Sequence, residues 1–566
     1  MAGSPVAPTR TRPRTDAFTF VLHWGLVAAV TLSLLTGLRI AADYDGSVAG
    51  ALSARVPWLL LRGSVIEWHI WSGWTLTFIA VSYAAFLWRA HQLDRVKVDR
   101  SVWLRLRLAR QRGRLWSDVP AWFAANVLVY QAGFVLIGLM ALTGWLLYAG
   151  FTLGLGYYRI ATIHGLFAYG FLLYVAVHVF TQLKAGSFWK IFQPRLDYGL
   201  AAGLAVIVSG TVVVFAFLLD RTEFADLPIV RVADPPALDG DPGDAVWAAS
   251  RIATIHTSRG ANFPNGEVTV AVRAVHDGER VYFQFRWPDP ERSQKHLPLV
   301  KEAAGWRVLQ SEFDANDEDD FYEDKFAVAL ARTPALASGT VHLGQDLVSG
   351  PHLPITRGLH FTEDGSLVDM WHWKSVRTGG MQPARMDDNH FGPLMASAKP
   401  GVRYTGGYTQ DPAGGGGYDL NWTKLTPDKP LSDTLVVPKF LPADDALLER
   451  IGVADLDPAV GDAGAWYLRR GEVVAYDPTL DDYAVGTVLP GVVIDGSFAG
   501  DRGDLPAGAE WRDGYWTLEV GRVLDTGSEF DVPLVPNRPV YLWVAVFNHS
   551  QTRHSQHLHP VRLMLR

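Results

Sequence analysis

The apolar positions divide the chain into two parts with different patterns. Up to about residue 220, long apolar segments alternate with short basic loops, whereas the later part is rich in Gly, Pro and Asp and has no long apolar run. Five segments approach the ~20 residues that a helix needs to cross a bilayer. They cover about 18–40, 65–88, 122–149, 161–183 and 198–219. The pattern predicts a membrane α-helical bundle of five spans, fused to a domain of another kind.

Basic residues indicate how the five segments cross the membrane. They gather in the stretch 1–14, in the loop 89–119 and in the loop after the fourth segment, while the loops 41–64 and 150–160 have few. Cytoplasmic loops carry an excess of Lys and Arg. We therefore expect a disordered, cytoplasmic N-terminal tail in a bacterial inner-membrane protein. Everything after the fifth segment is then periplasmic.

Four histidines lie inside the apolar segments, and ionisable groups inside a membrane indicate function. His164 and His178 are fourteen residues apart on one segment, so they leave the same helix face about 21 Å apart along the axis. With the predicted topology, His69 and His164 lie near the outer side of the membrane. His23 and His178 lie near the cytoplasmic side. Depth therefore pairs His69 with His164, and His23 with His178.

The composition limits what these pairs can bind. The chain has no cysteine, which excludes disulfides, thiolate-ligated iron–sulfur clusters and CxxCH-attached haem. A lone histidine can simply contact a neighbouring helix, and zinc fits poorly with two ligands and no carboxylate. Non-covalent haem b needs only two axial imidazoles in an apolar space. We expect two such haems. The net charge of −7 argues against a nucleic-acid partner.

Residues 15–220 resemble the di-haem cytochrome b membrane subunit of respiratory formate dehydrogenases and nickel–iron hydrogenases. The marks of the resemblance are the early "HW" at His23, the histidine of the second segment and the fourteen-residue gap in the fourth. The resemblance implies the same histidine pairing and electron exchange with the quinone pool in a lipid bilayer. Asn126 and Gln131 are polar residues of the third segment, and they serve equally well as quinone contacts or as helix–helix contacts.

The part from 221 to 566 reads as an all-β domain. Short alternating segments at 279–289, 324–331, 367–376, 514–524 and 539–548 are separated by Gly, Pro and Asp, as in β-sandwiches. The stretches "PPALDGDPGDAVWAAS", "VYFQFRWPDP" and "VDMWHWKSVRTGG" resemble the haem-binding domain of the ethylbenzene dehydrogenase gamma-subunit family. That resemblance implies a third haem b, and electron transfer to or from a periplasmic redox protein such as a molybdenum enzyme.

The ligands of this third haem are open. In the gamma subunits they are a methionine and a lysine, and those positions do not carry over cleanly. We expect His360 with His554 or His557 as ligands to the haem iron. Met370, His372 and Lys374 share one face of a predicted strand and are alternatives, and surface histidines without a ligand are a further one. The acidic run 314–324 lacks EF-hand spacing, so we expect a solvated loop there.

The prediction is a membrane-bound haem b cytochrome that moves electrons between quinone and a periplasmic partner. One rival function is a periplasmic sensor or ligand-binding domain on a cytochrome b anchor. Another is a haem-dependent reductase of a small acceptor. No catalytic residue is predicted, because the chain shows no convincing triad, phosphate loop or carboxylate pair.

Overall fold

The structure is a computed structural model of the whole chain. It describes residues 15–42, 61, 65–195, 203–214, 225–334, 362, 366–392, 408–447 and 466–566, apart from a few positions within these ranges. The chain forms two compact units. One consists of residues 1–38, 66–154 and 159–221, and the other of residues 39–65, 155–158 and 222–566. Each unit is described by itself.

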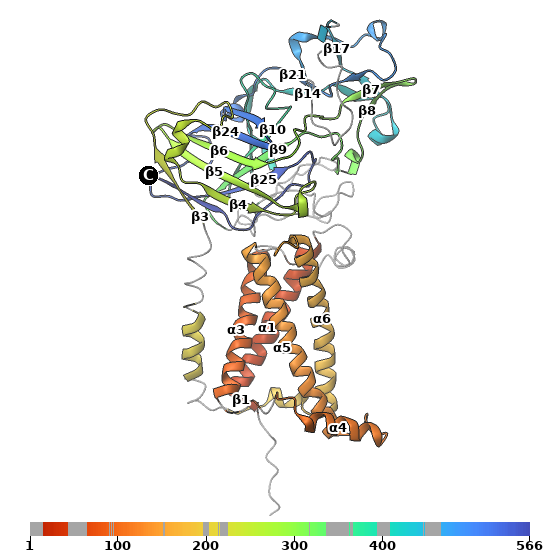
Figure 1. Cartoon of the computed structure of the whole chain (residues 1–566), viewed down its shortest axis with the longest axis vertical. Coiled ribbons are helices and arrows are strands. Elements are labelled where there is room, and N and C mark those ends of the chain that lie inside the picture. Colours follow the sequence, from red (N-terminus) through yellow and green to blue (C-terminus); the bar gives the residue numbers. More distant parts are fainter. Residues whose placement is uncertain are drawn as a thin grey trace, which may run out of the picture. The chain divides into compact units, whose positions relative to one another are not determined.

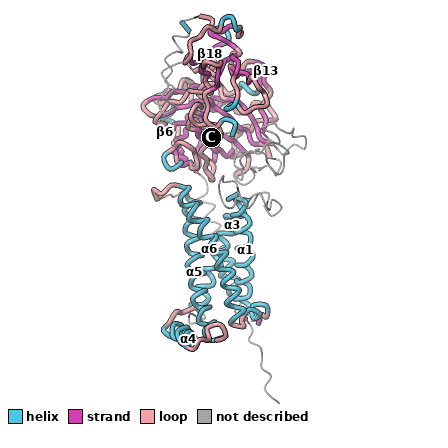
Figure 2. Tube along the Cα trace, turned by 90° about the vertical axis from the view of Figure 1, so that its right-hand side faces the viewer, coloured by secondary structure: helices cyan, strands magenta, loops and turns pink. Residues whose placement is uncertain are grey.

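Four long apolar helices lie side by side in the first unit (Figures 1 and 2). They are α1 (Ala17–Ala42), α3 (Val65–Arg89), α5 (Val119–Ala149) and α6 (Tyr157–Lys184). Each is long and apolar enough to cross a membrane. These four confirm the first four predicted segments. Of the fifth, at 198–219, the described part is a short apolar helix at Gly203–Val212, so five spans stay a prediction.

Local signals explain where these helices begin and end. The Asp118 side chain accepts a hydrogen bond from the Ala121 N–H at the start of α5 (3.2 Å), which satisfies a donor that a helix start leaves free. Gly150 ends α5 in the left-handed conformation (φ 69°), which glycine adopts without steric cost. A basic amphipathic helix, α4 (Arg100–Gln111), is capped by Asp99 and connects α3 to α5. The two-residue strands β1 (Thr15–Asp16) and β2 (Pro194–Arg195) pair in parallel.

The second unit is built on a twelve-stranded sheet in the order β12-β11-β10-β9-β25-β26-β3-β5-β6-β24-β23, with β4 paired to β5. Its strands are β3 (Ala225–Arg231), β4 (Ala253–Thr257), β5 (Val268–His276), β6 (Arg280–Pro288), β9 (Lys325–Ala331), β10 (Val368–Lys374), β11 (Asp387–Phe391), β12 (Tyr408–Gln410), β23 (Ala507–Arg512), β24 (Tyr515–Val523), β25 (Val540–Phe547) and β26 (Val561–Leu565). The predicted β-rich domain is confirmed, and each of the five predicted strands corresponds to one of these.

Four smaller sheets complete this unit. They are formed by β7 (Leu299–Glu302), β8 (Gly305–Val308), β15 (Trp422–Lys424), β16 (Val436–Pro438) and β20 (Val488–Leu489); by β14 (Tyr418–Leu420), β18 (Leu468–Arg469) and β21 (Val492–Ile494); by β13 (Ala413–Gly415) and β22 (Ala499–Gly500); and by β17 (Phe440–Pro442) and β19 (Val473–Ala475).

The main core lies between two halves of the large sheet. Phe285 of β6 packs against Phe326 of β9, with ring centres 4.9 Å apart, and Trp287 packs against Trp373 of β10 at 6.2 Å. These strands are not neighbours in the sheet order, so the sheet turns back and its halves face one another. Phe and Trp bury the most apolar area per residue, which makes this aromatic layer the main hydrophobic contribution to the fold.

The acidic run 314–324 is solvated only in part: Asp314 and Asp320 are exposed, as predicted, whereas three of its carboxylates are buried. Glu318 and Glu323 are 0 % exposed and Asp324 is 1 % exposed. Glu318 accepts hydrogen bonds from the backbone N–H groups of Ser311 (2.6 Å) and Phe321 (2.9 Å). These peptide donors take the place of water around its carboxylate. The prediction failed for these three carboxylates because a count of charges does not reveal which backbone donors a loop folds around.

Candidate haem sites

Both predicted histidine pairs of the helical unit come together. The ring centres of His69 on α3 and His164 on α6 are 6.2 Å apart. Those of His23 on α1 and His178 on α6 are 6.4 Å apart. Depth in the membrane and the fourteen-residue gap therefore predicted the partners of all four rings.

These separations match the spacing that one metal ion between the two imidazoles of each pair would require. Metal–imidazole bonds are about 2.0–2.1 Å, and a ring nitrogen lies ~1.1 Å from its ring centre, so a bridging metal holds the ring centres about 6.2–6.4 Å apart. Face-to-face stacking of the two rings, or a direct hydrogen bond between their nitrogens, would bring the ring centres closer together. The donor set and spacing fit a haem, which His69 with His164, and His23 with His178, would hold through its iron.

Hydrogen bonds hold the rings of the first pair. His69 Nδ1 lies 3.2 Å from the carbonyl oxygen of Ser33 and 3.0 Å from Thr36 Oγ1. His164 Nδ1 lies 2.8 Å from Thr143 Oγ1. The Thr143 hydroxyl donates to the Leu139 carbonyl (2.7 Å), so it accepts the proton of His164 Nδ1. A bound Nδ1–H fixes the tautomer, so the Nε2 of each ring, which has no partner among the described residues, can bind a metal.

Glycines leave room for these two rings. A Cβ atom at Gly37 would lie 3.2 Å from His69 Cε1, and one at Gly144 would lie 3.3 Å from His164 Cε1. Both distances are shorter than ordinary van der Waals contact, so any larger residue would push the ring aside. The absence of a side chain at each glycine therefore allows the neighbouring histidine ring to occupy its position.

The second pair is held by aromatic packing. The ring of His178 lies 5.7 Å from those of Tyr130 and Tyr174, and His23 lies against Trp24 at 5.8 Å. His178 Nδ1 is buried without a hydrogen-bond partner among the described residues. Of the two polar residues considered for a quinone site, Gln131 donates to the Val96 carbonyl, and Asn126 is buried with its Oδ1 unpartnered.

In the β-rich unit, His557 does not have a nitrogen free for iron. Its Nδ1 lies 2.8 Å from the His559 carbonyl, and its Nε2 accepts a hydrogen bond from the Val544 N–H at 2.9 Å. Both ring nitrogens thus bind backbone groups, which corrects the prediction for His557. His360 lies outside the described residues.

His554 and His372 fit a ligand role better. The His554 Nδ1 donates to the Ser555 carbonyl (2.8 Å), which leaves Nε2. The Nε2 of His372 is buried without a partner among the described residues. Both rings pack on Phe547, with centres at 4.9 Å and 5.4 Å. Burial, followed by the charge of Lys374, lowers the pKa of His372 well below its ordinary value, so the ring is neutral, as metal ligation requires.

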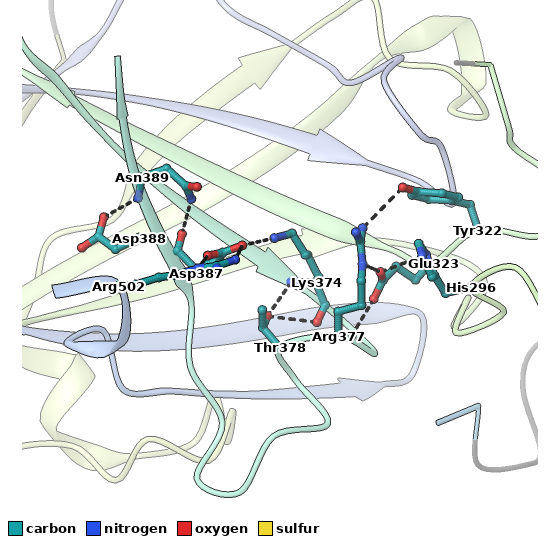
Figure 3. Close-up of polar contacts among 10 residues, drawn as sticks. All are labelled: His296, Tyr322, Glu323, Lys374, Arg377, Thr378, Asp387, Asp388, Asn389 and Arg502. Atoms are coloured by element: carbon teal, nitrogen blue, oxygen red, sulfur yellow. Dashed lines mark hydrogen bonds and ion pairs between the residues drawn. The ribbon is translucent and has the colours of Figure 1, made fainter. Parts of the chain in front are cut away.

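The sheet face around His372 has little side-chain bulk. Cross-strand register places Ala327 of β9 beside His372, and Ala329 between Met370 and Trp543. Lys374, the third alternative on this face, is occupied, because its Nζ forms an ion pair with Asp387 (Figure 3). This face of the sheet therefore combines a strip of alanines, flanking aromatic rings and an imidazole nitrogen that has no partner among the described residues.

Apolar spanning helices that hold paired histidines at metal-bridging separations define a membrane-bound cytochrome b. Residues 14–193 match the family described as prokaryotic cytochrome b561, which carries haem b and transfers electrons. Residues 244–558 match the family described as ethylbenzene dehydrogenase. Because this second match spans more than half of the sequence, the chain belongs to the ethylbenzene dehydrogenase family. Both resemblances noted in the sequence are confirmed.

Other comparisons add little. A carbohydrate-binding module of family 9 from Caldicellulosiruptor kristjanssonii, in complex with glucose, is 8 % identical and covers 60 % of this chain and 95 % of its own, with a TM-score of 0.22. A putative carbohydrate-binding protein from Bacteroides uniformis is also 8 % identical and covers 60 % of this chain and 99 % of its own, with a TM-score of 0.23. No curated protein matches the chain.

Proposed function

We propose that this cytochrome transfers electrons between the quinone pool and a redox partner in the periplasm. The observation that carries the proposal is the pair of bis-histidine arrangements, with ring centres 6.2 Å and 6.4 Å apart. His69 and His164 would hold one haem b, and His23 and His178 another. Bound haem iron supplies one-electron redox chemistry, while the protein positions and tunes it.

The helix that carries two of these histidines sets the separation of the sites. His164 and His178 lie on the same face of α6, with a rise of about 21 Å between them. Two redox centres at different depths would give electrons a route across most of the ~30 Å hydrocarbon core. Quinone would react near one of them, as in the formate dehydrogenase and hydrogenase subunits that the sequence resembles.

A third haem b in the β-rich unit would connect this route to the partner. Membership of the ethylbenzene dehydrogenase family supports it, and His554 and His372 beside Phe547 are the ligand candidates among the described residues. The gamma subunits of that family exchange electrons with molybdenum enzymes, so we propose a molybdoenzyme or another periplasmic redox protein as the partner.

The distribution of charge supports an orientation. Basic residues of α4 and its flanking loop favour a cytoplasmic position for that side of the bundle. With a fifth span at 198–219, the β-rich unit would be exported from a bacterial cytoplasm. The absence of cysteine is compatible with an oxidising compartment.

The test is a haem count on the detergent-purified full chain, by optical spectra of its pyridine haemochromes. We expect three haems per chain, and two in each of the variants His69→Ala and His178→Ala. His256→Ala is the matched control, because this histidine is exposed on β4 and bonds only Thr269 (3.0 Å) among the described residues. A wild-type count of zero, or an unchanged count in both membrane variants, would overturn the proposal. A wild-type count of two haems, with one haem in each membrane variant, would exclude only the proposed third haem.

A further inference from the structure

Three buried aspartates meet on the inner side of the large sheet. Asp369 lies on β10, Asp388 on β11, and Asp531 in the segment ahead of β25. In the β10–β11 register, Asp388 pairs with Trp371 and Asp369 with His390, so both carboxylates face the same side of the sheet. Their exposed fractions are 0 %, 0 % and 6 % for Asp369, Asp388 and Asp531. Most acidic clusters are solvated, and this one is not.

Each of the three carboxylates has one oxygen that is bonded and one that is not. Asp369 Oδ2 accepts from Arg522 and from the Val532 N–H (3.0 Å), Asp388 Oδ1 from the Asn389 N–H (2.9 Å), and Asp531 Oδ2 from Thr526 Oγ1 (2.5 Å). The remaining oxygens have no hydrogen-bond donor among the described residues: Asp369 Oδ1, Asp388 Oδ2 and Asp531 Oδ1. Unsatisfied buried polar atoms are costly and indicate a missing partner.

The spacing of these groups fits a single cation. One oxygen from each carboxylate lies within 4.8 Å of those of the other two. Calcium–oxygen bonds of about 2.3–2.6 Å let one ion bridge oxygens up to about 4.6–5.2 Å apart, so one calcium ion can reach all three carboxylates. A set of oxygen ligands without sulfur or nitrogen also favours a hard cation.

The charge of the cluster points the same way. Three carboxylates carry three negative charges, and the buried guanidinium of Arg522 supplies one positive charge against Asp369. A divalent cation would offset most of the negative charge that remains, to which Asp504, beside Asp388, adds a fourth carboxylate. Without a cation, burial raises the pKa of Asp388 well above its ordinary value, and the charges of Asp369 and Asp531 add to this effect. Asp411 and Asp504 are further acidic neighbours of Asp388, and Asp411 is paired with His390 (2.5 Å).

We propose that Asp369, Asp388 and Asp531 bind one calcium ion that links β10, β11 and the segment ahead of β25. This site is distinct from any haem site, because Asp369 and His372 lie on opposite faces of β10. The ion would fix the strand that carries Met370 and His372. It would also connect chain segments that are far apart in the sequence.

The test uses the full chain in detergent after passage over a chelating resin. Bound calcium is measured by mass spectrometry after dialysis against calcium chloride. The unfolding temperature of the β-rich unit is followed by tryptophan fluorescence with calcium or with EGTA. We expect one calcium ion more per wild-type chain than per Asp388→Asn chain. We also expect a rise of about 3 °C with calcium at a hundredfold excess over Kd, which is lost in Asp388→Asn.

Asp289→Asn is the matched control, because Asp289 is also fully buried with one oxygen unpartnered among the described residues, yet lies outside the cluster. It should keep the calcium response. If Asp388→Asn does not fold, Asp531→Asn replaces it. Tb³⁺ luminescence excited through tryptophan and displaced by calcium then tests the wild type directly. The proposal is overturned if the wild type binds no more calcium than the cluster variants, gives no Tb³⁺ signal, or is stabilised only by lowering the pH, as carboxylates that share protons would be.

Discussion

The ion-paired carboxylate of Glu323 gives the sharpest stability prediction. Its Oε2 accepts hydrogen bonds from the backbone N–H groups of Val376 (2.6 Å) and Arg377 (3.0 Å), while Oε1 meets the Arg377 guanidinium and lies 3.2 Å from His296 Nδ1 (Figure 3). Glu323 therefore joins the segment ahead of β9 to the turn after β10. Replacing it by glutamine keeps the shape and removes the charge.

The expected cost follows from the burial of both partners. Glu323 is 0 % exposed and the Arg377 side chain is 13 % exposed. Removing one partner of a buried ion pair costs about 3–5 kcal/mol, because the other charge stays buried without compensation. Glutamine retains one acceptor oxygen, so we expect about 3 kcal/mol. In a unit of this size that lowers the unfolding temperature by about 4 °C.

The assay is thermal unfolding of the full chain in detergent, followed by tryptophan fluorescence at pH 7. Glu302→Gln is the control: the Arg307–Glu302 pair has the same charges (3.1 Å), but its side chains are 37 % and 41 % exposed, and exposed pairs contribute about 0–1 kcal/mol. Equal unfolding temperatures for Glu323→Gln and Glu302→Gln would refute the reasoning.

The dependence on pH provides a second check on Glu323. Burial by itself would raise its pKa, but the charges of Arg377 and His296 outweigh burial, and the pKa lies well below its ordinary value. The folded state therefore binds fewer protons than the unfolded state as the pH falls below the ordinary value of 4.5. The advantage of wild type over Glu323→Gln should be complete at neutral pH and shrink as the pH falls below that value. A constant difference between pH 7 and pH 3 would contradict the assignment.

Three further predictions concern the haem sites. Gly144→Val should displace His164 and remove one haem from the optical count, because even a Cβ atom would lie 3.3 Å from the ring. Thr143→Val should keep that haem but make its midpoint potential more positive in a redox titration, since the ring loses the acceptor for its Nδ1–H (2.8 Å) and becomes a weaker donor to iron; an unchanged potential would argue against that hydrogen bond. His554→Ala should lose the haem of the β-rich unit whereas His557→Ala should retain it, and the reverse result in their spectra would restore His557 as the ligand.

The histidine pairs in the membrane could be predicted from the sequence because each histidine has a definite depth in the bilayer. A residue's position within an apolar segment gives its depth, and the direction of the segment follows from the charges around it. Two histidines at the same depth in neighbouring helices have few other partners. The hydrogen-bonding groups that hold the rings, Thr36 and Thr143, could not be found this way, because rotation of each helix about its axis depends on packing with its neighbours.

The aspartate cluster shows why a buried site in the β-rich unit could not be predicted from the sequence in the same way. Asp369 and Asp388 are adjacent only because β10 and β11 pair in one register, and Asp531 joins them from more than a hundred residues further along the chain. A shift of one residue in that pairing would turn one set of side chains to the opposite face. The acidic run 314–324 is a dense local charge, whereas the carboxylates with one unpartnered oxygen among the described residues, Asp369, Asp388 and Asp531, are far apart in the sequence. In a sheet, the register of the strands determines which side chains meet in a buried site, and the local composition of the sequence does not reveal that register.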